Sequence, residues 1–167
     1  REQAEGSVSP PYERRTQPAR SNHRTEFTIT SERATMSAMG HRHEYRTTIT
    51  WDGAGERGTS SYAGYGRQYR IRVDGKPDIE ASADPAFRGD PTRHNPEDLF
   101  VAALSACHML TYLALCAGKG IHVVAYEDAA TATMETTPDG GGRFTEVVLH
   151  PAVTIVQGDA ALAMTLH

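Results

Sequence analysis

Alternating polar and hydrophobic residues predict short β-strands in the first half of the chain. Residues 45–51 and 69–73 alternate as strands with one solvent-facing side do. Asp74-Gly75, directly after the second segment, is typical of a hairpin turn. Residues 59–62 are a further candidate strand. These segments together predict a small antiparallel sheet.

A long hydrophobic helix is predicted next. Residues 76–94 are rich in proline and glycine and are expected to form an irregular loop. Asn95 is a good N-cap, Pro96 suits the first helical position, and Glu97 places negative charge at the positive end of the helix dipole. The helix is expected to end at about Ala117. Because it is hydrophobic almost all round, it should be buried on most sides, which a domain this small achieves only as a dimer.

The last third of the chain predicts a hairpin and a second helix. Residues 121–135 have the pattern of a long strand, residues 138–142 form a turn signal, and residues 144–155 have the pattern of the partner strand. Asp159 is the expected N-cap of a helix that continues to His167.

Composition and charge narrow the function classes. The chain has 167 residues, with 17 basic and 21 acidic side chains and a formal net charge of −4. This balance argues against a nucleic-acid binder without sequence preference, which needs an excess of positive charge. The chain can bury one sizeable core. The hydrophobic run in residues 99–117 is long enough for a bilayer, but its polar side chains and helix caps favour a buried helix of a cytoplasmic protein without membrane contact.

The segment 1–42 differs from the remainder. It is rich in Arg, Ser, Thr and Glu and has no sustained hydrophobic period, so it is predicted to be a disordered extension. Translation upstream of the true start, at Met36 or Met39, is an alternative explanation. Its glutamates argue against an organelle transit peptide. The folded domain is therefore predicted to span residues 43–167.

The two cysteines occupy opposite faces of the predicted helix. Cys116 follows Cys107 by nine residues, which is a rotation of about 180° and a rise of about 13 Å, too far for a disulfide. Cys116 is predicted to be a core residue. Cys107 is open to two interpretations, a buried small hydrophobe or a reactive thiol. Glu97 lies ten residues before Cys107, or about 15 Å along a straight helix, so the two side chains cannot touch within one helix.

A metal site is not predicted. His41, His43, Cys107 and His108 are the candidate ligands, but no Cys-x-x-Cys pair is present and the two segments are far apart in the sequence.

The segment from Asn95 to His108 resembles the signature of the OsmC/Ohr family, the osmotically inducible and organic hydroperoxide resistance proteins. That signature has Asn-Pro-Glu, an apolar helix, and a cysteine ten residues after the glutamate, which is the spacing found here. Flanking segments are similar to an OsmC-like branch of this family: Trp51 and residues 58–62, 83–91 and 126–127. The resemblance spans roughly residues 43–167.

The resemblance implies an α+β fold with antiparallel sheets and a long buried central helix, in which two chains intertwine as a homodimer. It also implies thiol-dependent reduction of hydroperoxides, often organic ones, in defence against oxidative stress. Cys107 matches the peroxidatic cysteine, and Glu97 matches the glutamate that orients an arginine beside it. Arg67 is the first candidate for this arginine and Arg57 the second.

One departure from the family affects the expected turnover. The family carries a second, resolving cysteine in a helix that begins where residues 160–167 lie, and this chain has none there. The domain is therefore expected to be truncated at its C-terminus. Turnover would need an external thiol, such as a dithiol, and no cofactor. The alternative is a non-catalytic OsmC-like protein, structural or binding a small ligand in the dimer cleft, with Cys107 inert.

Overall fold

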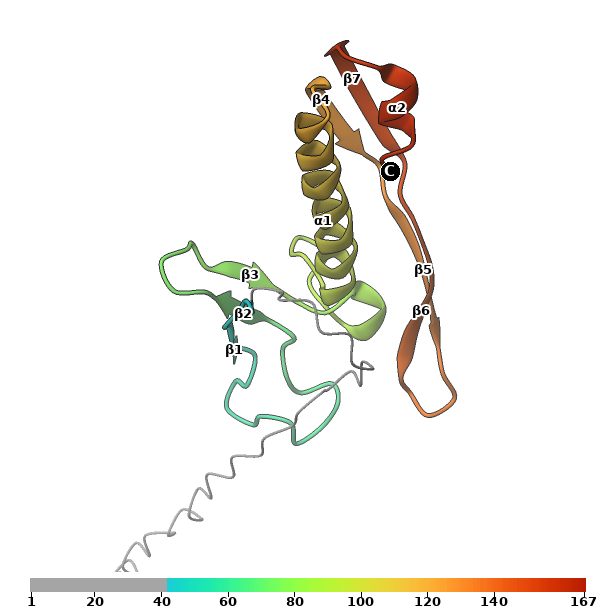
Figure 1. The fold of residues 1–167 in the computed structure, drawn as a ribbon. Coiled ribbons are helices and arrows are strands. Elements are labelled where there is room, and N and C mark those ends of the chain that lie inside the picture. Colours follow the sequence, from blue (N-terminus) through green and yellow to red (C-terminus); the bar gives the residue numbers. More distant parts are fainter. Residues whose placement is uncertain (1–41) are drawn as a thin grey trace, which may run out of the picture. The chain divides into compact units, whose positions relative to one another are not determined.

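The computed structural model of the chain describes residues 42–167. The chain divides after Arg42 into two units, and the second, His43–His167, holds all the described helices and strands. The predicted extension 1–42 lies outside the described residues except for Arg42. Antiparallel strand pairs and a long helix give an α+β architecture, as the resemblance implied (Figure 1).

The first sheet contains β1 (Thr48–Trp51), β2 (Tyr69–Arg72) and β3 (Ile79–Ala81), all antiparallel. The prediction missed β3 because its three residues lie in a segment rich in proline and glycine. In the same segment, η1 (Pro85–Phe87) forms one turn of 3-10 helix. The predicted loop 76–94 is therefore partly ordered, and a bridge from Ala81 to His94 leads the chain to the long helix.

The predicted strand at residues 59–62 is wrong, because this segment forms turns within the β1–β2 connection. The connection is closed by the Gly66 N–H, which donates to the Gly53 carbonyl at 2.8 Å, and by Trp51 Nε1, which donates to the Gly66 carbonyl at 2.8 Å. A Cβ at Gly53 would lie 2.1 Å from the Gly66 oxygen, so the close approach requires glycine. Turn hydrogen bonds therefore take the place of the strand pairing expected for this segment.

Helix α1 (Pro96–Gly118) confirms the predicted helix and its start. Asn95 Oδ1 accepts the Asp98 N–H at 2.7 Å, and Asp98 Oδ2 accepts the Asn95 N–H at 3.3 Å, which completes a capping box. Gly120, with φ of 70°, supports the left-handed turn beyond the C-terminal end.

The predicted long hairpin is divided into two strand pairs. β4 (His122–Asp128) pairs with β7 (Pro151–Gln157), and β5 (Thr131–Thr136) pairs with β6 (Gly142–Val148). The single strand expected over residues 121–135 is interrupted at residues 129–130, where the Asp128 carboxylate binds the His150 N–H and turns the chain. β4 and β7 lie beside the C-terminal half of α1, and the β5–β6 ribbon continues toward its N-terminal half (Figure 1).

Helix α2 (Ala160–Met164) begins as predicted, with the Asp159 carboxylate accepting the Ala161 and Leu162 N–H groups. It ends at Met164 and does not reach His167 as expected. Ala163 from this helix is buried against α1 and the start of β4.

The core of the described unit is small. Its buried cluster contains Tyr112, Cys116, Ile121 and Ala163, packed against a partly buried shell: Leu113, Val123, Tyr126, Val153, Ile155 and Leu166. Ala81 in β3 is also buried, outside this cluster.

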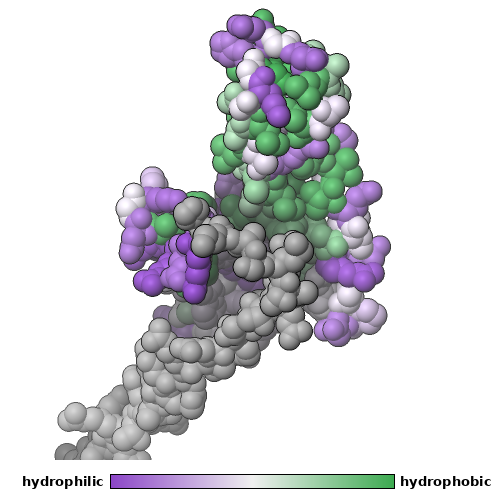
Figure 2. Space-filling model, viewed as in Figure 1, coloured by the Kyte–Doolittle hydropathy of each residue, from purple (hydrophilic) through white to green (hydrophobic). Residues whose placement is uncertain are grey.

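Within one chain, α1 is covered on one side only, which agrees with the expectation that a domain this small does not surround the helix alone. Of its residues only Tyr112 and Cys116 are buried, while Leu110 is 63% exposed. Figure 2 shows hydrophobic residues gathered over α1. By its length and composition alone, α1 could cross a membrane. Only 11% of its apolar 18-residue stretch is buried by the rest of the chain. Burial by the chain's own elements covers one side of this helix only.

Candidate functional site

Cys107 lies in the middle of α1, with its thiol exposed. Ala103, Leu110 and Ala114 are also exposed and lie within about 60° of Cys107 around the helix axis. The Thr111 hydroxyl, one helical turn further on, donates to the Cys107 carbonyl at 2.9 Å and is thus satisfied by the backbone. The thiol therefore sits within an apolar surface that the chain itself does not cover, which contradicts its interpretation as a core residue of the single chain.

Cys116 is 1% exposed, which confirms its predicted place in the core. Burial, followed by the hydrogen bond to Cys116, raises the pKa of Tyr112 to about 12. Because α1 is continuous between the two cysteines, they point to opposite sides of it and both are free thiols.

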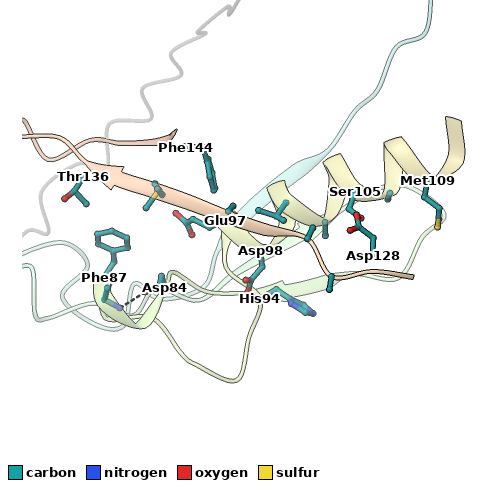
Figure 3. A pocket seen from close by; sticks show the side chains of 18 residues that line it. Asp84, Phe87, His94, Glu97, Asp98, Ser105, Met109, Asp128, Thr136 and Phe144 are labelled. Atoms are coloured by element: carbon teal, nitrogen blue, oxygen red, sulfur yellow. Dashed lines mark hydrogen bonds between the residues drawn. The ribbon is translucent and has the colours of Figure 1, made fainter. Parts of the chain in front are cut away.

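A cavity of about 1120 Å³ lies between α1 and the β5–β6 ribbon. Figure 3 shows Phe87 and Phe144 at one end, Ser105 and Asp128 at the other, and Glu97 between them. Its walls are mostly apolar, with contributions from Val101, Met109, Ala132 and Met134. Because Ser105 and Met109 are each two residues from Cys107, a rotation of about 200°, this cavity faces away from the thiol.

Glu97 has a buried carboxylate oxygen, Oε2, with no hydrogen-bond partner among residues 42–167. Its negative charge, after burial, raises the pKa of Tyr69 in β2, so the carboxylate lies near that strand. An unsatisfied buried carboxylate is costly, and a cationic donor would satisfy it. The uninterrupted helix keeps Glu97 and Cys107 about 15 Å apart along the axis, so the structure does not bring them together within one chain.

Neither candidate arginine joins Glu97 and Cys107 within the described chain. The Arg67 guanidinium lies 3.8 Å from the ring centroid of Tyr65 and 4.5 Å from that of Tyr62, and donates to both backbone carbonyls, at 2.8 Å to that of Tyr62. This arrangement fixes Arg67 in the β1–β2 connection. Arg57 is exposed in the same connection.

Asp128 links three segments near the cavity. Ser105 Oγ donates to Asp128 Oδ2 at 2.5 Å, and the His150 N–H donates to Oδ1 at 2.6 Å. The bond from Ser105 contributes most to a pKa of Asp128 below its usual value, with the His150 amide and the charges of His150 and His108 adding to it. The carboxylate therefore stays ionised and ties α1 to the bend of the hairpin. Sequence spacing gave no signal for this contact, because Ser105 and Asp128 are 23 residues apart.

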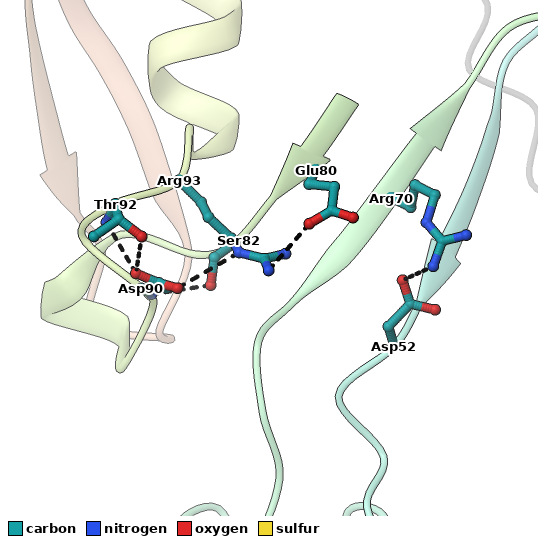
Figure 4. Close-up of polar contacts among 7 residues, drawn as sticks. All are labelled: Asp52, Arg70, Glu80, Ser82, Asp90, Thr92 and Arg93. Carbon is teal, nitrogen blue, oxygen red and sulfur yellow. Dashed lines mark hydrogen bonds and ion pairs between the residues drawn. The ribbon is translucent and has the colours of Figure 1, made fainter. Parts of the chain in front are cut away.

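The outer face of the first sheet carries alternating charges (Figure 4). Arg70 pairs with Asp52 at 3.0 Å, and Arg93 pairs with Glu80 at 3.1 Å and with Asp90 at 3.5 Å. These groups are partly exposed and satisfy one another. Such partly exposed pairs contribute little stability.

Of the four candidate metal ligands in the sequence, His41 lies outside the described residues. In residues 42–167, no three His, Cys, Asp or Glu side chains lie close enough together to hold a metal ion.

Comparisons with known proteins agree with the fold. Residues 89–166 match the family described as OsmC-like protein. The structure resembles that of an OsmC-like protein of unknown function from Vibrio cholerae, with 29% identity, a TM-score of 0.65, and coverage of 75% of this chain and 85% of that one. No curated protein matches the sequence.

Two further solved structures share the fold at lower identity. One is an organic hydroperoxide resistance protein from Elizabethkingia anophelis, with 21% identity, a TM-score of 0.53, and coverage of 71% of this chain and 76% of that one. The other is the organic hydroperoxide resistance protein OsmC from Legionella pneumophila, with 21% identity, a TM-score of 0.53, and coverage of 75% and 81%. Residues 89–166 thus match the OsmC-like family, and the chain has the fold of OsmC/Ohr proteins.

Proposed function

We propose that this protein is a thiol-dependent hydroperoxide reductase that acts in peroxide defence, with Cys107 as the peroxidatic residue. The observation that carries the proposal is the exposed Cys107 thiol on an apolar helix face, ten residues after the glutamate of an Asn-Pro-Glu helix start. The family match and the names of two relatives, both organic hydroperoxide resistance proteins, support it. An apolar surface beside the thiol suits the carbon chain of an organic hydroperoxide.

The proposed chemistry has two stages. The Cys107 thiolate attacks the outer peroxide oxygen, the O–O bond breaks, and the alcohol leaves with one proton while the sulfur becomes a sulfenic acid. Two equivalents of an external thiol, or one dithiol, then reduce the sulfenic acid to the thiol, forming water and a disulfide. No cofactor enters this scheme.

The active form is proposed to be a homodimer in the cytoplasm. The described chain leaves the Cys107 face of α1 uncovered and has two sheets of only two strands each, which are marginally stable alone. A second copy packed on α1 would cover this face. It would also supply an arginine to the unsatisfied Glu97 carboxylate and to the Cys107 thiolate. Arg67 of the second copy is the first candidate for this arginine, and Arg57 is the second. The contacts of Arg67 with Tyr62 and Tyr65 would either orient its guanidinium toward the site or rearrange when the dimer forms.

Cumene hydroperoxide consumption with dithiothreitol tests the proposal. Cys107→Ser is expected to abolish turnover, because a hydroxyl does not form the sulfenic acid. Cys116→Ala is the matched control, since it removes the other thiol from a buried position and should retain activity. Equal turnover in the wild type and Cys107→Ser would exclude the enzymatic function.

A second candidate function is suggested by the cavity between α1 and the β5–β6 ribbon. Its apolar walls and the unpartnered Glu97 oxygen suit a small molecule with an apolar body and a cationic group. This binder would leave Cys107 inert. Titration with hydrophobic amines such as benzylamine, followed by calorimetry, should then show binding that Glu97→Gln weakens and Cys107→Ser does not. Turnover that depends on Cys107, without amine binding, would reject this candidate.

A further inference from the structure

The cavity between α1 and the β5–β6 ribbon is acidic as well as apolar. Its lining includes four carboxylates, those of Asp84, Glu97, Asp98 and Asp128, together with the imidazole of His94. No lysine or arginine of residues 42–167 lines the cavity, and none of them forms an ion pair with any of the four carboxylates. A cleft lined by charges of one sign concentrates ligands of the opposite sign. The cavity therefore favours cations.

The hydrogen bonds of these carboxylates within residues 42–167 leave their charges uncompensated. Asn95 Nδ2 donates to Asp84 Oδ2 at 3.2 Å, and the Asn95 N–H donates to Asp98 Oδ2 at 3.3 Å. Asp128 accepts from a hydroxyl and from a backbone amide, which are neutral donors as well. The buried Oε2 of Glu97 has no partner in this part of the chain, so it is the first position that a ligand cation would occupy.

Glu97 and Asp128 mark two separate anionic positions in the cavity (Figure 3). Glu97 lies in the first turn of α1, whereas Asp128 is bonded at 2.5 Å to Ser105, eight residues further along the same helix. Eight residues of helix rise by about 12 Å. Each Asp128 oxygen accepts one hydrogen bond, and a carboxylate has about four acceptor positions, so Asp128 can also accept a bond from a ligand.

The wall between the two carboxylates is apolar. Val101 and Ala102 lie between Glu97 and Ser105 on α1, and Ala132 and Met134 of β5 line the same space. Methylene groups placed against this wall leave water, which is favourable. An extended chain advances by about 1.2 Å per bond, so about ten bonds cover 12 Å. A ligand that fits the whole cavity therefore has an ammonium group at each end of an unbranched chain.

We propose that this cavity binds an aliphatic α,ω-diamine, with one ammonium group on the free Glu97 oxygen and the other on Asp128. The inference rests on the ligand-binding candidate described above and does not require peroxide reduction. Each end of the ligand forms a hydrogen bond between two charged groups, which is the stronger class of hydrogen bond. Within residues 42–167, no cluster suits a metal ion as the alternative cation.

Calorimetric titration of the full chain at neutral pH with three amines tests the two-ended site. Diaminooctane has the matching length, octylamine has one ammonium group, and diaminobutane is too short to reach both carboxylates. Diaminooctane should bind at least about tenfold more tightly than either of the others, because it alone forms the second charged hydrogen bond. Octanoate, with the opposite charge, should not bind.

The outcomes of this titration separate the inference from the candidate function on which it rests. Equal affinities for diaminooctane and octylamine would overturn the two-ended site, while the ligand-binding candidate would stand. Binding of none of the amines would reject both.

Substitutions at the two ends locate the ligand. Asp128→Asn should reduce the affinity for diaminooctane to that for octylamine, whereas Glu97→Gln should weaken the binding of both amines. Glu127→Gln is the matched control, because Glu127 is the exposed neighbour of Asp128 on β4 and does not line the cavity.

Filling the cavity is a test that leaves every carboxylate in place. Ala132→Phe adds a ring to the cavity wall and should abolish binding of diaminooctane, while Ala152→Phe changes an exposed alanine of β7 outside the cavity and should not. Circular dichroism of each variant checks that the fold is kept. Tenfold tighter binding of diaminooctane than of octylamine that survives Asp128→Asn, or diamine binding that survives Ala132→Phe, would overturn the proposed site.

Discussion

Asp128 offers a sharp test of how the hairpin is held against α1. Its two carboxylate oxygens accept hydrogen bonds from the Ser105 hydroxyl at 2.5 Å and from the His150 amide at 2.6 Å. Asp128→Asn keeps the size of the side chain but replaces one acceptor oxygen by an NH₂ group. The amide oxygen can still accept the His150 N–H and the NH₂ group can donate to Ser105 Oγ, so both hydrogen bonds persist but lose their charged partner.

The expected loss of stability can be worked from these contacts. A hydrogen bond to a charged group contributes about 1.5–3 kcal/mol. A neutral hydrogen bond contributes about 0.5–1.5 kcal/mol, so each of the two bonds should weaken by about 1 kcal/mol. Because the Asp128 side chain is only half-buried, Asp128→Asn should lower the free energy of unfolding by about 1.5–2 kcal/mol. With a urea m-value of about 1–3 kcal/mol/M, the unfolding midpoint should shift down by about 1 M.

Urea unfolding followed by circular dichroism, at fixed protein concentration, measures this shift. Glu127→Gln is the matched control, because Glu127 is the exposed neighbour on the same strand and should shift the midpoint by less than about 0.2 M. The pKa of Asp128 is below its ordinary value of 3.8, so its contribution is complete above that value and is lost as the pH falls toward the lowered pKa. The gap between wild type and variant should therefore shrink below pH 4. Equal midpoints for the two proteins at pH 7, or an equal effect of Glu127→Gln, would refute the reasoning.

Three further substitutions test the helix start, a close backbone contact and the dimer. Asn95→Ala removes the side-chain oxygen that accepts the Asp98 N–H and keeps the backbone bond to the Asp98 carboxylate, so it should cost about 1 kcal/mol and lower Tm in a thermal melt. Gly89→Ala should destabilise more strongly, because the new Cβ would lie 1.5 Å from the Ala83 carbonyl oxygen; an unchanged Tm would contradict this. Leu110→Glu places a charge on the exposed face of α1 and should convert a dimer to monomers in sedimentation, whereas a persisting dimer would exclude this face as the interface.

The sequence by itself determined the local elements with clear physical signals. Asn95 and Pro96 marked the start of α1. A cap side chain accepts one of the free N–H groups of the first turn, and proline has no N–H to satisfy, so both act in any helix, whatever packs against it. The same holds for the start of α2 at Asp159. Helix periodicity also separated Cys107 from Cys116, because nine residues of continuous helix leave no freedom in their relative direction. The family signature depends on this same local spacing.

Tertiary contacts decided the rest. Residues 59–62 were a candidate strand, but no neighbouring strand pairs with them, and strand pairing is non-local. The long hairpin bends because the carboxylate of Asp128 finds a hydroxyl and an amide distant in sequence. The contact of His108 with His167, 59 residues away, has no sequence signal at all. Hydrophobicity around α1 predicted burial, yet which faces a single chain covers depends on the placement of β4 and α2, and these reach one side only.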